Sequence, residues 1–416
     1  MSDELLQYYN RELAYLRRQG AEFAEAYPKV AGHLRMSEEA VEDPHVSRLL
    51  EGVAFLTAQI RQRLDSHFPE LTDVLMGTLY PDYQAPVPSM TILQLEPAPA
   101  QTHAAPLEDG QAFETAADDV PTCRFAARGE QWVAPISVQD AAFENSPFDA
   151  PRPEGVEKAR SVIRLRLSSP VAMSETNAPW LRFYLHGQPH QSHELYDLIL
   201  RTGLGFAMVP ANDRRQVRFF PSERIKPVGF AEEDAMVPYG QRSFEGYRLL
   251  VEHFLFPEKF LFAQLDGLAD QWPNDSEVDL YIYLGEGSTE QEKSFVADHM
   301  RLWCLPAINL FEENLEPVRR DETDHAYHLV PRYRNSDAYE VVGVNRVDLV
   351  NNDRVRELAP YYGLGHPRWQ NDINVYWHLH RQSADWAGGQ YEPGTESYLS
   401  LVDQRFAQQS MAALPK

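Results

Sequence analysis

The first eighty residues repeat hydrophobic side chains every three or four positions, which is the spacing of an amphipathic helix. This pattern predicts helices over residues 3–27, 44–68 and 69–79. The first helix is expected to end before Pro28, because the residue that precedes a proline is held out of the helical region. Asp43 is followed by a proline, which is typical of an N-cap and the first helical position, so the second helix is predicted to begin there.

Narrow apolar seams run along the first two predicted helices. The seam of the first helix consists of Leu6, Tyr9, Leu13, Leu16 and Phe23. The seam of the second helix consists of Val46, Leu49, Val53, Leu56 and Ile60. Two interpretations remain open: the seams pack inside a helical hairpin of this chain, or the first helix joins a bundle with another chain. The regular spacing of the first seam over three heptads is a property of inter-chain seams.

From residue 89 onwards the period changes to two, which indicates β structure. Residues 163–167 and 279–284 alternate apolar and polar side chains, as half-exposed strands do, and residues 190–201 have a helical pattern. The expected fold is α+β, with an N-terminal helical hairpin or bundle followed by two mixed, mainly β domains. The predicted parts are residues 1–88 (helical, for oligomerisation), 89–215 (a first α+β domain) and 216–416 (a second, mainly β domain).

Residues 244–261, FEGYRLLVEHFLFPEKFL, form an apolar stretch that is too short to span a membrane. A helix is predicted through about Phe254, followed by a break at Pro257 and a strand. We expect this stretch to be the core around which the second domain folds. The residues assigned to that core are Phe244, Tyr247, Leu250, Phe254, Pro257 and Phe260. Exposure of Phe254 and Phe260 would instead make the stretch a docking surface.

The chain carries a net charge of −24, from 38 Lys and Arg against 62 Asp and Glu. An acidic protein is repelled by phosphate backbones and by anionic lipid, so nucleic acid and membrane surfaces are not expected partners. No apolar run reaches the roughly 18 residues of a membrane helix, and the first residues lack the pattern of a signal peptide. The two cysteines are far apart and indicate reduced thiols, so a cytoplasmic protein is expected.

The search for catalytic motifs returns only weak candidates. The segment from His193 to Asp197 resembles a zinc-protease HExxH motif but has aspartate where the second histidine belongs. His378 and His380 share one face of a predicted strand without further ligands nearby in sequence. Glu252 and His253 are neighbours on a helix, so they do not face each other. We therefore assign no catalytic, cofactor or metal residue and expect a structural protein; the alternative is an accessory or secreted hydrolase or carbohydrate-binding protein.

Several stretches resemble one protein family. They are Tyr8–Leu34, Asp43–Met90, Phe244–Phe262, Leu305–Glu313 and, more weakly, His328–Val347. In this order they resemble the TssF (ImpG/VasA) family of type VI secretion baseplate wedge proteins. The likeness extends over nearly the whole chain. Members of that family usually continue with another domain, so the chain is expected to lack the C-terminal part.

The resemblance implies a fold like that of phage baseplate wedge proteins and a structural, non-enzymatic role without cofactors. It implies a cytoplasmic bacterial protein at the membrane-docked baseplate of a contractile injection machine. The implied partners are TssG and a second TssF copy, together with TssE and TssK, in a baseplate that surrounds the VgrG spike and nucleates the contractile sheath. On this basis, the first seam is expected to pack in a bundle with TssG or the second TssF.

Overall fold

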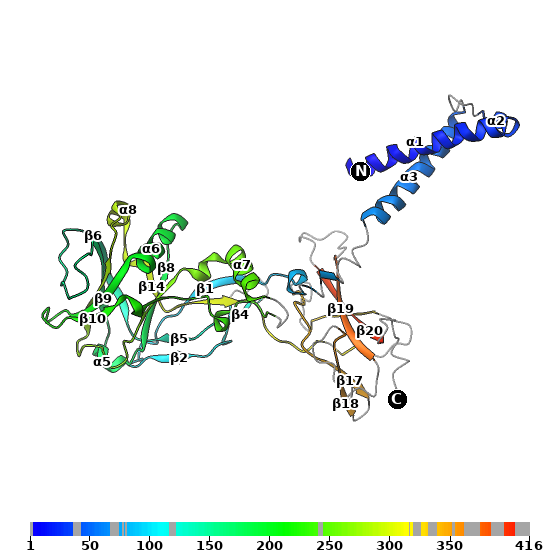
Figure 1. Cartoon of the computed structure of the whole chain (residues 1–416). Helices are drawn as coiled ribbons and strands as arrows, with labels where there is room; N and C mark the ends of the chain where they lie inside the picture. Colours follow the sequence, from blue (N-terminus) through cyan, green and yellow to red (C-terminus); the bar gives the residue numbers. More distant parts are fainter. Residues whose placement is uncertain are drawn as a thin grey trace. The chain divides into compact units, whose positions relative to one another are not determined.

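The computed structural model of the chain is α+β, and its element order is shown in Figure 1. It describes residues 3–35, 43–66, 75–76, 79, 81–115, 122–239, 244–315, 317–318, 326–331, 339–351, 354–361, 375–383 and 395–403. The chain divides into two compact units, Met1–Gln84 and Ala85–Lys416. The first unit therefore ends close to the predicted boundary at residue 88.

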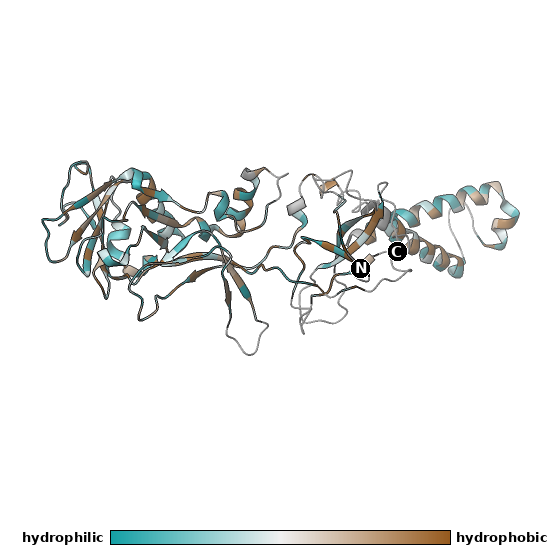
Figure 2. Ribbon diagram, turned by 90° about the horizontal axis from the view of Figure 1, so that it is seen from below, coloured by the Kyte–Doolittle hydropathy of each residue, from teal (hydrophilic) through white to brown (hydrophobic). Residues whose placement is uncertain are grey.

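The first unit is a helical hairpin made of α1 (Asp3–Ala26), the short α2 (Pro28–His33) and α3 (Pro44–Ser66). The Asp43 carboxylate accepts a hydrogen bond from the backbone N–H of His45 at 2.8 Å, which confirms the predicted N-cap of α3. Along both long helices, hydrophobic and hydrophilic residues alternate in bands (Figure 2). The predicted third helix, over 69–79, lies largely outside the described residues.

The second unit contains three sheets around its largest core. The first sheet has the order β10 (Arg218–Pro221), β9 (Gly203–Pro210), β13 (Glu277–Leu284), β7 (Ser161–Ser168) and β6 (Ser137–Asn145). The second sheet has the order β11 (Ile225–Pro227), β12 (Phe262–Asp266), β8 (Trp180–Leu185) and β14 (Met300–Leu302). The third sheet has the order β1 (Met90–Gln94), β15 (Cys304–Ile308), β4 (Arg124–Ala127) and β3 (Ala112–Glu114).

The predicted domain boundary between residues 215 and 216 is wrong, because β13 pairs with strands on the other side of it. This strand pairs along its whole length with β7 and with β9, so strands from both predicted domains form one sheet. A cut at residue 215 would separate the central strand from its two neighbours. Sequence periodicity identifies strands but does not reveal such distant pairing.

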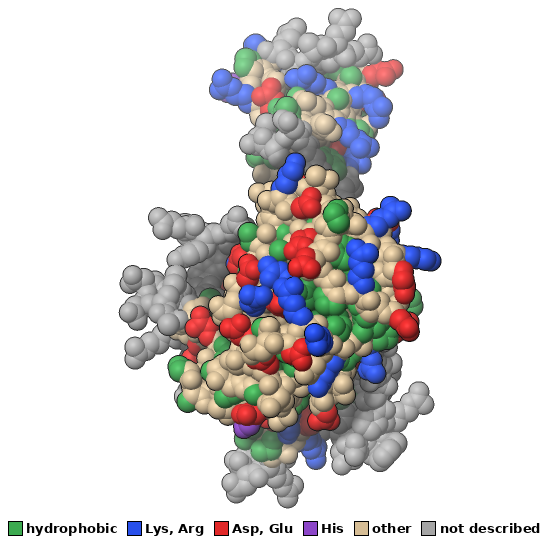
Figure 3. Space-filling model, turned by 90° about the vertical axis from the view of Figure 1, so that its left-hand side faces the viewer, with side chains coloured by type: hydrophobic (Ala, Val, Ile, Leu, Met, Phe, Trp, Pro, Cys, Tyr) green, Lys and Arg blue, Asp and Glu red, His purple; other side chains and the backbone are tan. Residues whose placement is uncertain are grey.

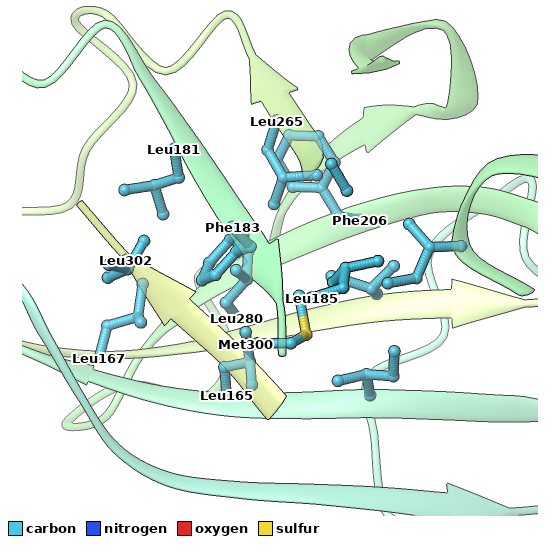
Figure 4. Packing of buried hydrophobic residues seen from close by; sticks show 14 of the residues in the cluster. Leu165, Leu167, Leu181, Phe183, Leu185, Phe206, Leu265, Leu280, Met300 and Leu302 are labelled. Atoms are coloured by element: carbon cyan, nitrogen blue, oxygen red, sulfur yellow. The ribbon is translucent and has the colours of Figure 1, made fainter. Parts of the chain in front are cut away.

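The core of this unit lies where the apolar faces of the first two sheets meet (Figure 4). The alternation in β7 is confirmed, since Leu165 and Leu167 are buried while Arg164 and Arg166 face outwards. The outward arginines pair with neighbouring strands, Arg164 with Asp140 at 2.7 Å and Arg166 with Asp279 at 2.9 Å. Seen from the side where β6, β9 and β10 lie, basic and acidic side chains are interspersed (Figure 3).

Shorter elements complete the unit. The helices are α5 (Met173–Thr176), α6 (Pro189–Thr202), α7 (Glu245–Leu255) and α8 (Thr289–Ser294). The 3-10 turns are η1 (Pro81–Gln84), at the end of the first unit, and η2 (Ser222–Arg224), η3 (Glu232–Asp234), η4 (Pro257–Phe260) and η5 (Ala297–His299). The remaining strands are β2 (Ala105–Leu107) with β5 (Gln131–Val133), β16 (Ala326–His328) with β20 (Thr395–Asp403) and β19 (Val375–Ser383), and β17 (Val347–Asn351) with β18 (Arg354–Leu358).

Candidate interaction surfaces

The helix α7 carries an exposed apolar face. It begins after Phe244 and ends at Leu255, and η4 follows at Pro257, so the predicted helix and its break are confirmed. Its exposed side chains include Phe244 at 71% and Phe254 at 78% of their full accessible area. We call the exposed set the α7 stripe; it consists of Phe244, Tyr247, Leu250, Phe254 and Leu255.

These exposures correct the sequence prediction for this stretch. Phe244, Tyr247, Leu250 and Phe254 do not form the core of the unit, because their side chains face solvent. Beyond the helix the prediction was partly right: Phe260 is buried and Pro257 is half-buried. The stretch therefore has an exposed half and a buried half, and the largest core of the unit lies elsewhere, between the sheets.

The face of α7 that points inwards is polar. Arg248 and Glu252 are 3% and 0% exposed, and Lys259 from η4 is 0% exposed. The Glu252 carboxylate accepts hydrogen bonds from the Lys259 ammonium and, at 2.8 Å, from the backbone N–H of Met236. Arg248 lies 3.7 Å from the same carboxylate and donates to the carbonyl of Ala231 at 3.3 Å. We call these three side chains the buried ion triad.

The buried ion triad determines which side of α7 faces out. A buried charge is tolerated only when it is paired and hydrogen-bonded, because its desolvation costs several kcal/mol. Turning the stripe inwards would remove Glu252 from Lys259 and leave an unpaired ammonium in the interior. Burial lowers the pKa of Lys259, and its bond to Glu252 partly offsets that effect. The stripe is thus held outwards by the polar contacts on the opposite face.

The end of α7 is attached to the third sheet, beside which it lies in Figure 1. Phe256 is buried in a small cluster with Met236 and Ile308, and Met90 and Ile92 of β1 pack against that cluster. Glu252 and His253 point to opposite sides, since the first is buried and the second is exposed. This geometry gives no acid–base pair, as helical spacing predicted.

The hairpin provides a second apolar surface. Its two long helices meet through small residues, of which Ala24, Ala54 and Ala58 are buried. Between the helices Arg61 forms an ion pair with Glu12, which is only 3% exposed. Alanines at the contact let the helices approach closely, and they leave larger apolar side chains on the outer sides.

The seam residues of the first helix are only partly covered within the hairpin. Tyr9, Leu13 and Leu16 are half-buried, while Leu6 and Phe23 are exposed. The seam of the second helix is more open. Its exposed residues are Leu49, Val53, Leu56 and Ile60. Packing inside the hairpin therefore does not account for the second seam, and an exposed apolar row of this size is typical of an interaction site.

The weak catalytic candidates receive structural roles. On α6, Asp197 bonds to Arg201 at 2.9 Å, so it is engaged in an ion pair. On β19, the rings of His378 and His380 are stacked, with 6.4 Å between their centroids. Burial lowers the pKa of both imidazoles. Within the described ranges, one group of three possible metal ligands was not expected from the sequence, namely His190, Glu194 and Glu290.

That group combines His190 and Glu194, one helical turn apart on α6, with Glu290 from α8, and its ligand atoms lie within 4.8 Å of one another. The i,i+4 spacing was visible in the sequence, whereas the approach of α8 was not. The side chains of His190 and Glu290 are exposed, and His190 Nδ1 lies 3.6 Å from Glu290 Oε1, as in an ordinary surface ion pair.

A groove with a volume of about 520 Å³ lies among β1, the loop before β6 and β14. In its wall, Arg301 and Asp298 bond to each other at 2.8 Å. None of the helices that the structure describes combines the length and apolar character needed to cross a membrane.

Comparisons with known proteins show which proteins this chain is similar to. A sequence model of the family described as type VI secretion system, TssF, matches residues 1–414. Type VI secretion system component TssF1 of Pseudomonas aeruginosa is 32% identical over 97% of this chain and 68% of that protein. The cryo-electron microscopy structure of a TssK-TssF-TssG baseplate subcomplex matches with a TM-score of 0.68 and 26% identity. That match covers 85% of this chain, which spans 65% of the solved chain. The chain therefore belongs to the TssF family of the type VI secretion system.

Proposed function

We propose that this chain is a structural subunit of a type VI secretion baseplate and that it assembles with TssG and TssK. The observation that carries the proposal is the structural match to a TssK-TssF-TssG baseplate subcomplex, together with the family match over nearly the whole chain. Two exposed apolar surfaces support it, because soluble monomers rarely expose rows of large hydrophobic side chains.

The role is one of assembly and not of catalysis. Side chains that resembled catalytic or metal-binding groups are engaged in an ion pair and a ring stack, and the family is a structural one. The chain contributes shaped surfaces that hold other subunits in place, so no cofactor is required. A cytoplasmic position at the membrane-docked baseplate follows from this role.

The hairpin surface is the proposed site for the bundle with TssG or with a second copy of this chain. The seam of α3 is open to solvent, and the seam of α1 is only partly covered, so each seam has surface left for a further helix. Coiled-coil packing of such seams buries large side chains in the holes of a facing helix. TssE, the VgrG spike and the sheath are the more distant expected partners of the assembled wedge.

Changing Leu56 to Asp tests the hairpin. Leu56 is 61% exposed, so the variant is expected to fold with an unchanged melting temperature. Loss of a central anchor typically costs about 2 kcal/mol, so TssG binding should weaken by roughly thirtyfold. The measurement is titration of purified TssG into the chain. Gln59→Asp, an exposed polar site on the same helix, is the control. Equal binding by Leu56→Asp and the control would contradict the proposal.

A further inference from the structure

His190, Glu194 and Glu290 form a group that we call the α6–α8 cluster, where α8 lies beside α6 (Figure 1). His190 and Glu194 are four residues apart on α6, so their side chains lie on one face of the helix, one turn apart. Glu290 reaches the same place from the first turn of α8. The three ligand atoms lie within 4.8 Å of one another. An imidazole and two carboxylates are ordinary ligands of zinc and related divalent ions.

The charges of the α6–α8 cluster are not balanced by the side chains around it. Glu194 and Glu290 bring two carboxylates to close range, and like charges at this distance repel each other. His190 can offset one of these charges at most. In the part of the chain that the structure describes, no lysine or arginine forms an ion pair with either glutamate. A divalent cation between the three side chains would neutralise both carboxylates, with the imidazole as a neutral ligand.

The spacing within the cluster is that of ligands around an ion. His190 Nδ1 lies 3.6 Å from Glu290 Oε1, which is longer than the roughly 2.7–3.2 Å of a hydrogen bond between nitrogen and oxygen. Two ligand atoms that are each about 2.1 Å from one tetrahedral zinc ion are about 3.4 Å from each other. The observed separation is close to that value, so an ion fits between the two atoms with little movement. A small rotation of the Glu194 carboxylate brings the third ligand to it.

A buried amide contacts the cluster from the interior of the protein. Gln291 is fully buried, and its Nε2 donates to Glu194 Oε2 and to the carbonyl of Gln191, each at 3.1 Å. The Oε1 of the same amide is also buried, and no described residue gives it a hydrogen bond. Buried polar atoms without a partner are rare in proteins. A water molecule on the ion would be a donor next to this amide, and the carboxylates of metal sites commonly have such a hydrogen-bonded neighbour.

The first turn of α8 is fixed by bonds that do not involve the three ligands. Ser288 caps the helix, since its hydroxyl accepts a hydrogen bond from the backbone N–H of Gln291 at 3.1 Å. Asn145 of β6 donates to the carbonyl of Ser288 at 3.0 Å. Phe295, directly after α8, is buried in the largest core. Glu290 is therefore presented to α6 by an element that is already held in place, as an ordered metal site requires.

We propose that the α6–α8 cluster binds one divalent transition-metal ion, with zinc as the preferred ion, through His190, Glu194 and Glu290. Three protein ligands leave the fourth tetrahedral position to a water molecule. Gln291 acts as a positioning residue, because it orients the Glu194 carboxylate without touching the ion. The bound ion joins α8 to α6. The proposal concerns side chains of this chain alone and does not depend on the baseplate function.

Calorimetric titration of Zn²⁺ into the full chain, without an affinity tag and after removal of metal by a chelator, tests the site. We expect one tight binding event per chain. Mg²⁺ requires oxygen ligands in octahedral geometry, so it should bind roughly a hundredfold more weakly. His190 and Glu290 are exposed, so His190→Ala and Glu290→Gln should melt as the unmodified metal-free chain does, but each should bind Zn²⁺ at least tenfold more weakly.

His193→Ala is the matched control, because His193 is an exposed histidine of the same helix outside the cluster, and it should bind Zn²⁺ as the unmodified chain does. Equal affinity in His190→Ala and His193→Ala would place the ion elsewhere and overturn the proposal. The absence of a tight event, or equal affinity for Mg²⁺ and Zn²⁺, would overturn it as well.

Co²⁺ in place of Zn²⁺ reports the geometry, since tetrahedral Co²⁺ absorbs visible light far more strongly than the hydrated ion. Strong bands are expected with the unmodified chain and with His193→Ala, and they should be lost in His190→Ala. A weak spectrum of the hydrated type in all three proteins would contradict the site. Gln291→Met retains the volume of the side chain but removes its bond to Glu194, so Zn²⁺ affinity should fall about tenfold. Unchanged affinity would overturn the role of Gln291.

Discussion

Glu252 is a fully buried carboxylate to which Lys259, Arg248 and the Met236 backbone N–H are directed. Its partners are cations from η4 and from one turn earlier on α7, so a single side chain joins three segments. Buried ion pairs are weak evidence for stability, since apolar replacements are often as stable, but loss of one partner is strongly destabilising. The triad therefore contributes chiefly to the orientation of α7.

Glu252→Gln leaves two buried cations without their carboxylate. The expected loss is about 3–5 kcal/mol in the free energy of unfolding, measured by urea denaturation. Glu258→Gln, one position from Lys259 but exposed, serves as the matched control and should change it by less than about 0.5 kcal/mol. A loss no larger than that of the control would show that the triad is not needed to hold α7.

The sequence predicted the existence and bounds of α7 but not its orientation. Its apolar row and the polar positions Arg248 and Glu252 both have helical spacing, so either side was a candidate for the interior. The choice depends on Lys259 and on the backbone of Met236, which come from outside the helix. The sequence also left the role of the α3 seam open, because the neighbouring alanines Ala54 and Ala58 are small enough to form the contact with α1 in its place.

The sheet of β16, β20 and β19 should lose stability in acid. Burial lowers the folded-state pKa of His378 and of His380 below the usual value of 6.5. The unfolded chain therefore binds protons first as the pH falls, so stability is complete above about 6.5 and declines through the folded-state pKa. Fluorescence of the buried Trp377, followed in urea at several pH values, measures this decline.

Replacing His378 and His380 by Phe should remove most of that pH dependence while retaining the stacked arrangement of rings. His193→Phe, an exposed histidine on α6, is the control and should leave the dependence intact. A decline of equal size in the double variant would assign the acid sensitivity to other groups.

The predicted boundary at residue 88 lies within a few residues of the division between the two units. The second predicted boundary, at residue 215, was wrong, because strands pair across it. A change of period from helical to alternating marks residue 88 well, because it is a local signal. The strand β13 pairs with β9 and with β7, and β7 lies more than a hundred residues earlier in the sequence. A local sequence pattern does not encode such distant pairing.

Truncation distinguishes the two boundaries. A fragment of residues 85–416 keeps every member of the largest core and should remain folded, with near-native melting by circular dichroism. A fragment that ends at residue 215 lacks β13 and exposes the apolar edges of β7 and β9, so it should be insoluble or unfolded. Cooperative melting of the shorter fragment would restore the predicted boundary.

The outward-facing apolar side chains of α7 also affect the solubility of the free subunit. An apolar surface carried by a strand edge offers unpaired backbone groups and promotes aggregation. On a helix, each backbone group within the interior turns is already bonded, so the α7 stripe offers side chains alone. With a net charge of −24 on each copy, encounters between free subunits are disfavoured. The free subunit can therefore expose the α7 stripe while charge repulsion between copies opposes self-association.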